Sequence, residues 1–166
     1  MGGIGARTGH HLSFYMAQIL NISNQMKHKK ILLVEDDYLD VISVKRALAK
    51  LNVEHTLYVA HNGVDALSML MGSNDASSDK VQPDIILLDM NMPKMNGLEF
   101  LRIIKKYYSL NNIKVFVMTT SAEEYDRNES KRLGISGYIL KPIDFEQKKK
   151  DESGLATADL KNELSA

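Results

Sequence analysis

The sequence predicts an α/β fold in which a five-stranded parallel sheet is doubly wound, with helices on both faces. From residue 29 onward, short apolar runs alternate with stretches whose apolar residues recur at helical spacing. The run over residues 85–88 is apolar throughout and lies between Pro83 and Gly97, which is typical of a strand buried on both faces. Such alternation produces parallel strands joined by right-handed helical crossovers.

The first half of this region contains two predicted strands and two predicted helices. Residues 31–34 are apolar and predict a buried strand, and residues 38–51 repeat apolar side chains at helical intervals. Residues 55–60 include Tyr and Val, which favour a short strand. A helix is predicted over residues 63–71, and the polar residues 72–82 predict a loop.

The second half repeats the pattern. The strand over residues 85–88 precedes a helix over residues 98–108, where apolar residues again follow helical spacing. Residues 114–118 predict another buried strand, residues 122–133 a largely polar helix, and residues 138–140 a last short strand.

Composition and charge exclude several functions. The 166 residues include 21 Lys and Arg against 21 Asp and Glu, so no overall field attracts nucleic acid or an anionic membrane. The chain has no cysteine, which excludes disulfides, thiolate zinc sites and cysteine nucleophiles. No apolar stretch approaches the roughly 18 residues of a membrane span, and the N-terminus lacks a signal-peptide pattern. We expect a cytoplasmic protein without nucleic-acid or membrane partners, and the sequence is compatible with a homodimer.

Four of the five predicted strands are followed by acids, hydroxyls or a lysine. Each alone has a structural explanation, since an aspartate or a hydroxyl can cap a helix or start a turn, and a lysine can point to solvent. A common site explains the four together better than coincidence, because the carboxyl ends of parallel strands meet at one edge of a sheet. The four sets are Glu35-Asp36-Asp37, Asp89, Thr119-Thr120-Ser121 and Lys141-Pro142.

These residue types favour phosphoryl transfer. Glu35, Asp36 and Asp89 would crowd negative charge into one place, and a hard divalent ion such as Mg²⁺ with oxygen ligands relieves that crowding. Lys141 could offer its ammonium to one phosphoryl oxygen and Thr119 its hydroxyl to another. A carboxylate nucleophile in such a site forms an acyl phosphate.

Residues 29–147 resemble the receiver domain of two-component response regulators. The resemblance implies the flavodoxin-like strand order 2-1-3-4-5, and the 20 residues from 147 to 166 suggest the stand-alone, single-domain type. The motifs that carry it are Val34-Glu35-Asp36, Asp89 followed by Met92-Pro93 and Gly97, Met118-Thr119-Thr120-Ser121, and Tyr138 three residues before Lys141-Pro142.

The resemblance implies a role for each site residue. Asp89 accepts a phosphoryl group from a histidine kinase or a histidine phosphotransfer protein. Asp36, Asp89 and the backbone carbonyl of Asn91 hold Mg²⁺, and Glu35 acts through water. The protein is then a signalling phosphoacceptor that assists its own phosphorylation and dephosphorylation, not an enzyme with varied substrates.

The resemblance also implies a switch. Lys141 contacts the phosphate and its bond to Pro142 is cis, Thr119 moves toward the phosphoryl group, and Tyr138 turns inward behind it. This changes a face that binds a downstream protein. The alternative is a phosphotransferase or hydrolase with an aspartyl-phosphate intermediate, but such enzymes usually have a second acid at the position of Asn91, and its absence argues against fast turnover.

The ends of the chain depart from the receiver pattern. Residues 1–28 form an N-terminal extension with helical spacing over residues 12–22, and residues 148–166 form a polar C-terminal tail. The fifth helix of the receiver is atypical or truncated, because few apolar residues follow Phe145. We expect residues 12–22 to cover the sheet face that this helix leaves open. A marginal helix in the tail, or an altered reading frame at the end of the chain, are the alternatives.

Overall fold

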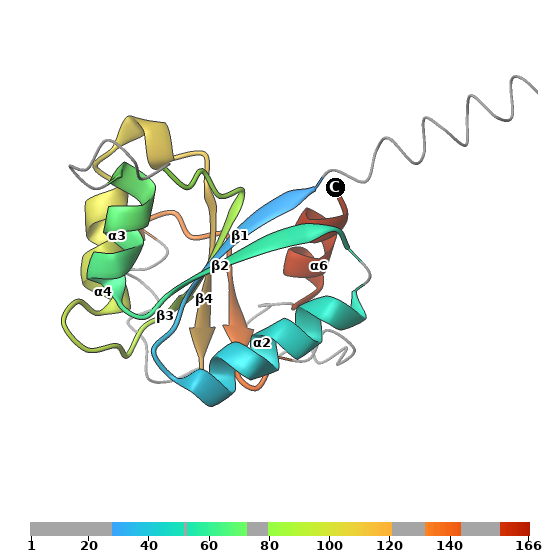
Figure 1. The fold of residues 1–166 in the computed structure, drawn as a ribbon. Helices are drawn as coiled ribbons and strands as arrows, with labels where there is room; N and C mark the ends of the chain where they lie inside the picture. The colour runs from blue at the N-terminus through green and yellow to red at the C-terminus, as the bar shows by residue number, and fades with distance from the viewer. Residues whose placement is uncertain (1–27, 52, 73–79, 121–131, 144–156) are drawn as a thin grey trace, which may run out of the picture.

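The sheet has five strands, and all neighbouring strands are parallel. The computed structural model describes residues 28–51, 53–72, 80–120, 132–143 and 157–166. The strand order is β2-β1-β3-β4-β5 (Figure 1), so the predicted fold class and strand order are confirmed. The strands are β1 (Lys29–Val34), β2 (His55–Ala60), β3 (Ile85–Asp89), β4 (Lys114–Thr119) and β5 (Gly137–Leu140).

Three of the helices follow residues whose side chains accept hydrogen bonds from free backbone N–H groups. Asp37 caps α2 by accepting hydrogen bonds from the backbone of Leu39 and Asp40. Asn96 and Glu99 form a reciprocal capping box at the start of α4. Among the described residues, no helix is long and apolar enough to cross a bilayer. The helices are α2 (Tyr38–Lys50), α3 (Gly63–Met71), α4 (Gly97–Ile104), the 3-10 helix η1 (Tyr108–Leu110) and α6 (Thr157–Ser165).

Two predicted helices have different outcomes. The helix predicted over residues 98–108 ends as α4 at Ile104, because tighter turns follow it, in which Tyr107 N donates to Ile104 O and Leu110 N to Tyr107 O. The polar helix predicted over residues 122–133 falls mainly outside the described residues.

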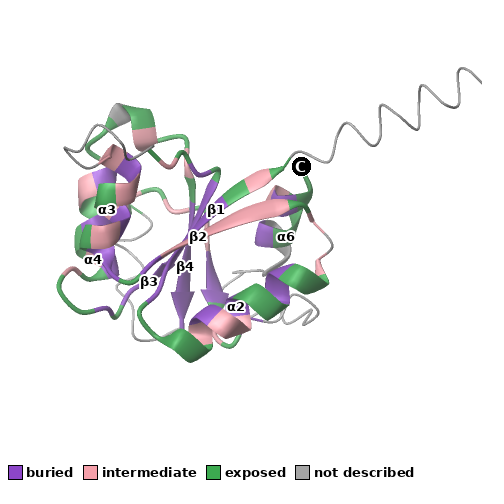
Figure 2. Ribbon diagram, in the orientation of Figure 1, coloured by how far each residue is buried: buried purple, intermediate pink, exposed green. Residues whose placement is uncertain are grey.

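Alternate residues of each strand pack on opposite faces of the sheet. In β1, Leu32 and Val34 face the core beneath α3 and α4, whereas Ile31 and Leu33 face the core beneath α2 and α6. All four residues are fully buried, and the ribbon of Figure 2 is coloured as buried over much of the central strands. A strand covered on both faces needs an unbroken apolar run, which is why these strands could be recognised in the sequence.

Helix α6 lies within residues 148–166, which the sequence predicts to be a polar tail. Its Leu160 and Leu164 are 0% and 2% exposed and pack in the same core cluster as Ile139 of β5. Two leucines four residues apart lie on one side of a helix, so a short stripe suffices to dock an otherwise polar segment. The cover that we expected from residues 12–22 and the atypical fifth helix after Ile143 both fall outside the described residues.

Candidate functional site

The ends of β1, β3, β4 and β5 meet at one edge of the sheet and line a cleft of about 250 Å³. The structure thus brings together every predicted site residue except Tyr138. The cleft is lined by Glu35, Asp36, Asp37, Asp40, Asp89, Met90, Asn91, Met118, Thr119, Thr120 and Lys141.

Three acids from two adjacent strands lie close together in this cleft. Each of Glu35, Asp36 and Asp89 offers a carboxylate oxygen, and these oxygens lie within 4.8 Å of one another. Asp36 is exposed, but Glu35 and Asp89 are only 1% and 7% exposed. Asp37 N donates to Glu35 Oε1 over 3.1 Å, and Asn91 N donates to Asp89 Oδ2 over 2.9 Å. The turns that follow the strands therefore orient the two buried carboxylates.

Lys141 lies among these carboxylates. Its Nζ is 2.7 Å from Glu35 Oε2, 2.7 Å from Asp89 Oδ1 and 2.8 Å from Asp40 Oδ2. The side chain is only 10% exposed. Its backbone N–H donates to the carbonyl of Thr119 over 2.8 Å, which fixes the lysine beside the end of β4. The Lys141–Pro142 bond is cis, as the resemblance implied.

The pKa values of two groups in the cleft are both raised, for different reasons. Burial raises the pKa of Glu35 above its usual value and the charge of Asp89 adds to this, although the hydrogen bond with Lys141 opposes it. Burial alone would lower the pKa of Lys141, but hydrogen bonds with the carboxylates of Asp40, Asp89 and Glu35 outweigh it, so the net pKa is raised. Lys141 therefore stays charged across the physiological range.

The donor set fits a hard divalent cation. The three clustered acids supply oxygen ligands from fixed backbone positions, and Asp36 is exposed and so accessible from solvent. A small dication such as Mg²⁺ takes one or two carboxylates together with carbonyl oxygens and water. Asn91 lines the same cleft, which is where a backbone carbonyl ligand is needed. The acids present thus suit the metal that the sequence predicts.

The structure separates the two predicted switch residues. Thr119 ends β4, is 9% exposed and lines the cleft. Tyr138 lies on β5, is 5% exposed and packs in the core beneath α3 and α4. The Tyr138 hydroxyl is buried and has no hydrogen-bond partner among the described residues.

A close backbone contact shapes the turn after Asp89. Gly97 N donates to the carbonyl of Met90 over 3.0 Å. A Cβ atom at Gly97 would lie 2.5 Å from the carbonyl oxygen of Asp89, which no side chain can tolerate. The glycine therefore lets the start of α4 approach the end of β3 closely, which explains its place in the motif.

Sequence reasoning missed Asp40. This residue lies in the first turn of α2, where an acid is readily interpreted as favourable to the helix dipole. The sequence did offer one indication, because Asp40 follows Asp36 and Asp37 by about one helical turn. Residues with this spacing lie on the same side of a helix and can reach the same cleft.

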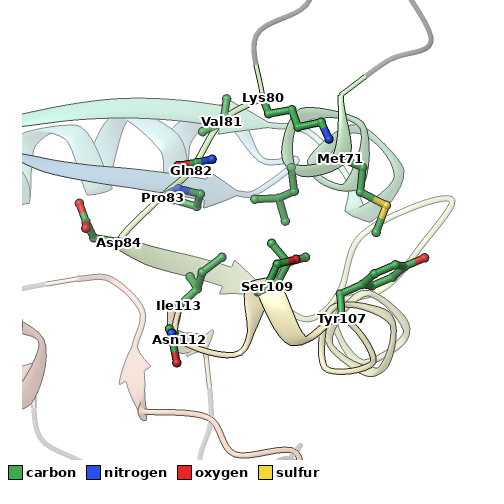
Figure 3. A pocket seen from close by; sticks show the side chains of 12 residues that line it. Met71, Lys80, Val81, Gln82, Pro83, Asp84, Tyr107, Ser109, Asn112 and Ile113 are labelled. Carbon is green, nitrogen blue, oxygen red and sulfur yellow. The ribbon is translucent and has the colours of Figure 1, made fainter.

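A second, larger cavity lies near the opposite edge of the sheet. It has a volume of about 740 Å³ and lies between the end of α3, the segment leading into β3 and the segment that contains η1 (Figure 3). Met71 and Tyr107 line it, and so do Pro83 and Asp84, which precede β3. It contains none of the predicted site residues, and the smaller cleft, with its acids and its buried lysine, is the better functional candidate.

Comparisons with known proteins agree with this choice. The family model of the response regulator receiver domain matches residues 31–150. Response regulator Rcp1 of Synechocystis sp. is 36% identical over 113 residues, which cover 68% of this chain and 76% of that protein. Sporulation initiation phosphotransferase F of Bacillus subtilis is 34% identical over 122 residues, covering 74% and 89%.

Solved structures give the same result. A two-component response regulator from Legionella pneumophila superposes with a TM-score of 0.64 at 39% identity, covering 70% of this chain and 89% of that one. The Mn(2+)-bound form of response regulator Rcp1 has a TM-score of 0.61 at 31% identity, covering 82% and 89%. The resemblance predicted from the motifs is thereby confirmed.

Proposed function

We propose that this chain, which belongs to the response regulator receiver domain family, accepts a phosphoryl group on Asp89. The observation that carries the assignment to this residue is the contact of 2.7 Å between Lys141 Nζ and Asp89 Oδ1 in an acidic cleft. As a phosphorylation-dependent receiver, the protein is a signalling phosphoacceptor, and the alternative of a phosphotransferase or hydrolase is not favoured.

The proposed phosphoryl donor is a phosphohistidine of a histidine kinase or a phosphotransfer protein. The names of two relatives support this choice. One is sporulation initiation phosphotransferase F, and the other is the sensor histidine kinase CheAY of Helicobacter pylori, which is 31% identical over 134 residues. The chain spans only 16% of CheAY, so the match concerns one part of that protein.

In the proposed step, a carboxylate oxygen of Asp89 attacks the phosphorus atom of the donor. An oxygen–phosphorus bond forms, the bond from phosphorus to the leaving group breaks, and the leaving group keeps the electron pair. Lys141 and Thr119 hold the phosphoryl oxygens, where negative charge must be balanced. Mg²⁺ held by Asp36, Asp89 and the Asn91 carbonyl, with Glu35 acting through water, would supply further charge neutralisation.

The switch that we propose starts at Thr119. This residue is beside Lys141 in the cleft and can move toward a phosphoryl group on Asp89. Tyr138 would occupy the space behind it, and its burial is compatible with that inward position. The movement would change the surface that a downstream protein binds.

Labelling by a small phosphoryl donor tests the assignment. The protein is incubated with Mg²⁺ and acetyl phosphate, and its intact mass is measured. We expect a gain of one phosphoryl group that is absent in Asp89→Asn. Asp84→Asn is the matched control, because Asp84 precedes the other end of the same strand and does not line the cleft. An unlabelled wild type, or a labelled Asp89→Asn variant, would overturn the assignment, and rapid turnover of varied phosphoesters would favour the enzyme alternative.

A further inference from the structure

We propose that Asp40 is a positioning residue that holds the Lys141 ammonium in place for the phosphoryl group on Asp89. This inference deepens the proposed function and rests on it. It starts from the ion pair between Asp40 Oδ2 and Lys141 Nζ, which are 2.8 Å apart although the residues are 101 positions apart in the chain. The contact joins the first turn of α2 to the end of β5.

Lys141 has as many ammonium donors as it has carboxylate partners. An ammonium group has three N–H donors. In Lys141 they are matched by three carboxylate oxygens, one each from Glu35, Asp89 and Asp40. A phosphoryl group on Asp89 needs one of these donors, and the donor now directed at Asp89 is the one best placed to supply it. The other two partners must then keep the ammonium in position.

Glu35 and Asp40 differ in what else they can bind. Glu35 belongs to the cluster of three acids that suits a divalent ion, so its carboxylate has a second task. Asp40 is outside that cluster and lies on a helix instead of a strand end. Its carboxylate therefore remains available to Lys141 when the other acids are engaged.

The backbone of Asp40 is held in place by the cap of α2. The backbone N–H of Asp40 donates to Asp37 Oδ1 over 3.1 Å, so the cap of α2 fixes the position of the residue. Side chains of a helix lean toward its N-terminus, which here means toward the cleft. A fixed carboxylate can restrict a long lysine side chain that would otherwise sample many rotamers.

The contact also differs from an ordinary surface ion pair. Lys114 and Glu163 form such a pair at 3.3 Å, and Glu163 is 37% exposed, close to the 35% of Asp40. The two lysines differ, since Lys114 is 51% exposed and Lys141 only 10%. Exposed pairs contribute little, but Asp40 acts on a lysine that is buried among reacting groups. Glu163→Gln is therefore a matched control for Asp40→Asn.

The experiment measures the initial rate of labelling by acetyl phosphate at saturating Mg²⁺. We expect Asp40→Asn to reduce the rate about fivefold, the effect of losing one partly exposed charged contact. Glu163→Gln should leave it unchanged, and Asp40→Glu, which keeps the carboxylate, should restore part of it. In a Lys141→Ala background, Asp40→Asn should have no further effect, because Asp40 acts through that lysine.

A second measurement needs neither metal nor phosphoryl donor. With ¹⁵N-labelled lysine, the ammonium signal of Lys141 should be observable in the wild type and in Glu163→Gln, because three carboxylates slow its exchange, and it should broaden in Asp40→Asn. Three results would overturn the role of Asp40. They are a labelling rate of Asp40→Asn equal to or above that of wild type, a further loss of the full size when Asp40→Asn is added to Lys141→Ala, and an unchanged Lys141 ammonium signal in Asp40→Asn. An unlabelled wild type would instead refute the proposed function, and the ammonium signal would still decide whether Asp40 holds Lys141.

Discussion

Two lysines at opposite edges of the sheet both form ion pairs, but only one of these ion pairs belongs to the functional site. Lys114 begins β4, is 51% exposed, and pairs with Glu163 of α6 at 3.3 Å. Lys141 follows β5, is 10% exposed, and contacts three carboxylates at 2.7 to 2.8 Å. The first pair is an exposed link between a strand and a helix. The second is a buried charge centre, and its surroundings, not its residue type, identify it as functional.

The largest predicted difference comes from removing each lysine in turn. Lys141→Ala leaves Glu35 and Asp89 buried without their cationic partner, so we expect a loss of about 3 kcal/mol in the free energy of unfolding. Lys114→Ala should cost about 1 kcal/mol or less, because its pair is exposed. Urea unfolding in the presence of EDTA measures both losses.

The same two variants separate function from stability. Labelling by acetyl phosphate should fall at least tenfold in Lys141→Ala, since one group that balances the phosphoryl charge is lost. It should stay at the wild-type level in Lys114→Ala. If the two variants lost equal stability, or if Lys141→Ala were fully labelled, Lys141 would not differ from Lys114 in the way proposed.

A second prediction concerns α6, which carries the partner of Lys114. Leu160 is fully buried beneath the sheet, so Leu160→Ala should destabilise the fold by about 3 kcal/mol through the lost burial and the cavity that remains. Leu39→Ala is a control in the first turn of α2. Leu39 is 73% exposed, so this substitution should change the unfolding free energy by about 0.5 kcal/mol or less.

Labelling of Asp89 should persist in Leu160→Ala at temperatures where the variant is folded, because α6 lines no part of the cleft. The contrast would fail if Leu160→Ala were as stable as wild type, since α6 would then not be needed to cover its face of the sheet.

The cleft could be predicted from the sequence, but the cover of one sheet face could not. Apolar runs fix where buried strands end, and parallel strands bring those ends together, so Glu35, Asp89 and Lys141 were recognisable without coordinates. Helix α6 offers only Leu160 and Leu164 in a polar segment, and two apolar positions give too weak a periodicity to separate a docked helix from a tail.

The contact of Asp40 with Lys141 was hidden for a different reason. Local patterns report helix starts, and an acid in a first turn already has a local explanation in the helix dipole. Its partner is 101 positions away, and the two groups meet only because the fold places the start of α2 and the residue after β5 around the same cleft. Long-range polar contacts of this kind leave no periodic trace in a sequence.

A third prediction concerns Glu35, one of the two buried acids of the cleft. Burial raises the pKa of Glu35, so between its usual value of 4.5 and the raised value the folded state binds more protons than the unfolded state. The contribution of this group to the unfolding free energy is therefore greatest at low pH and declines as the pH rises through that window. We expect Glu35→Gln, measured in EDTA, to lose this component. If the unfolding free energies of wild type and Glu35→Gln changed with pH in the same way, the raised pKa of Glu35 would be contradicted.

The smallest predicted effect concerns Tyr138, which lies on the strand that leads to Lys141 but is directed into the core. Its buried hydroxyl has no hydrogen-bond partner among the described residues, so it is desolvated without compensation. Tyr138→Phe removes that cost while keeping the ring, and should leave the unfolding free energy unchanged or raise it by up to about 1 kcal/mol. Labelling of Asp89 should match wild type, because Tyr138 does not line the cleft. A loss of stability in Tyr138→Phe would mean that the hydroxyl has a hydrogen-bond partner in the folded protein. A loss of labelling would mean that a core residue behind the cleft also contributes to phosphorylation of Asp89.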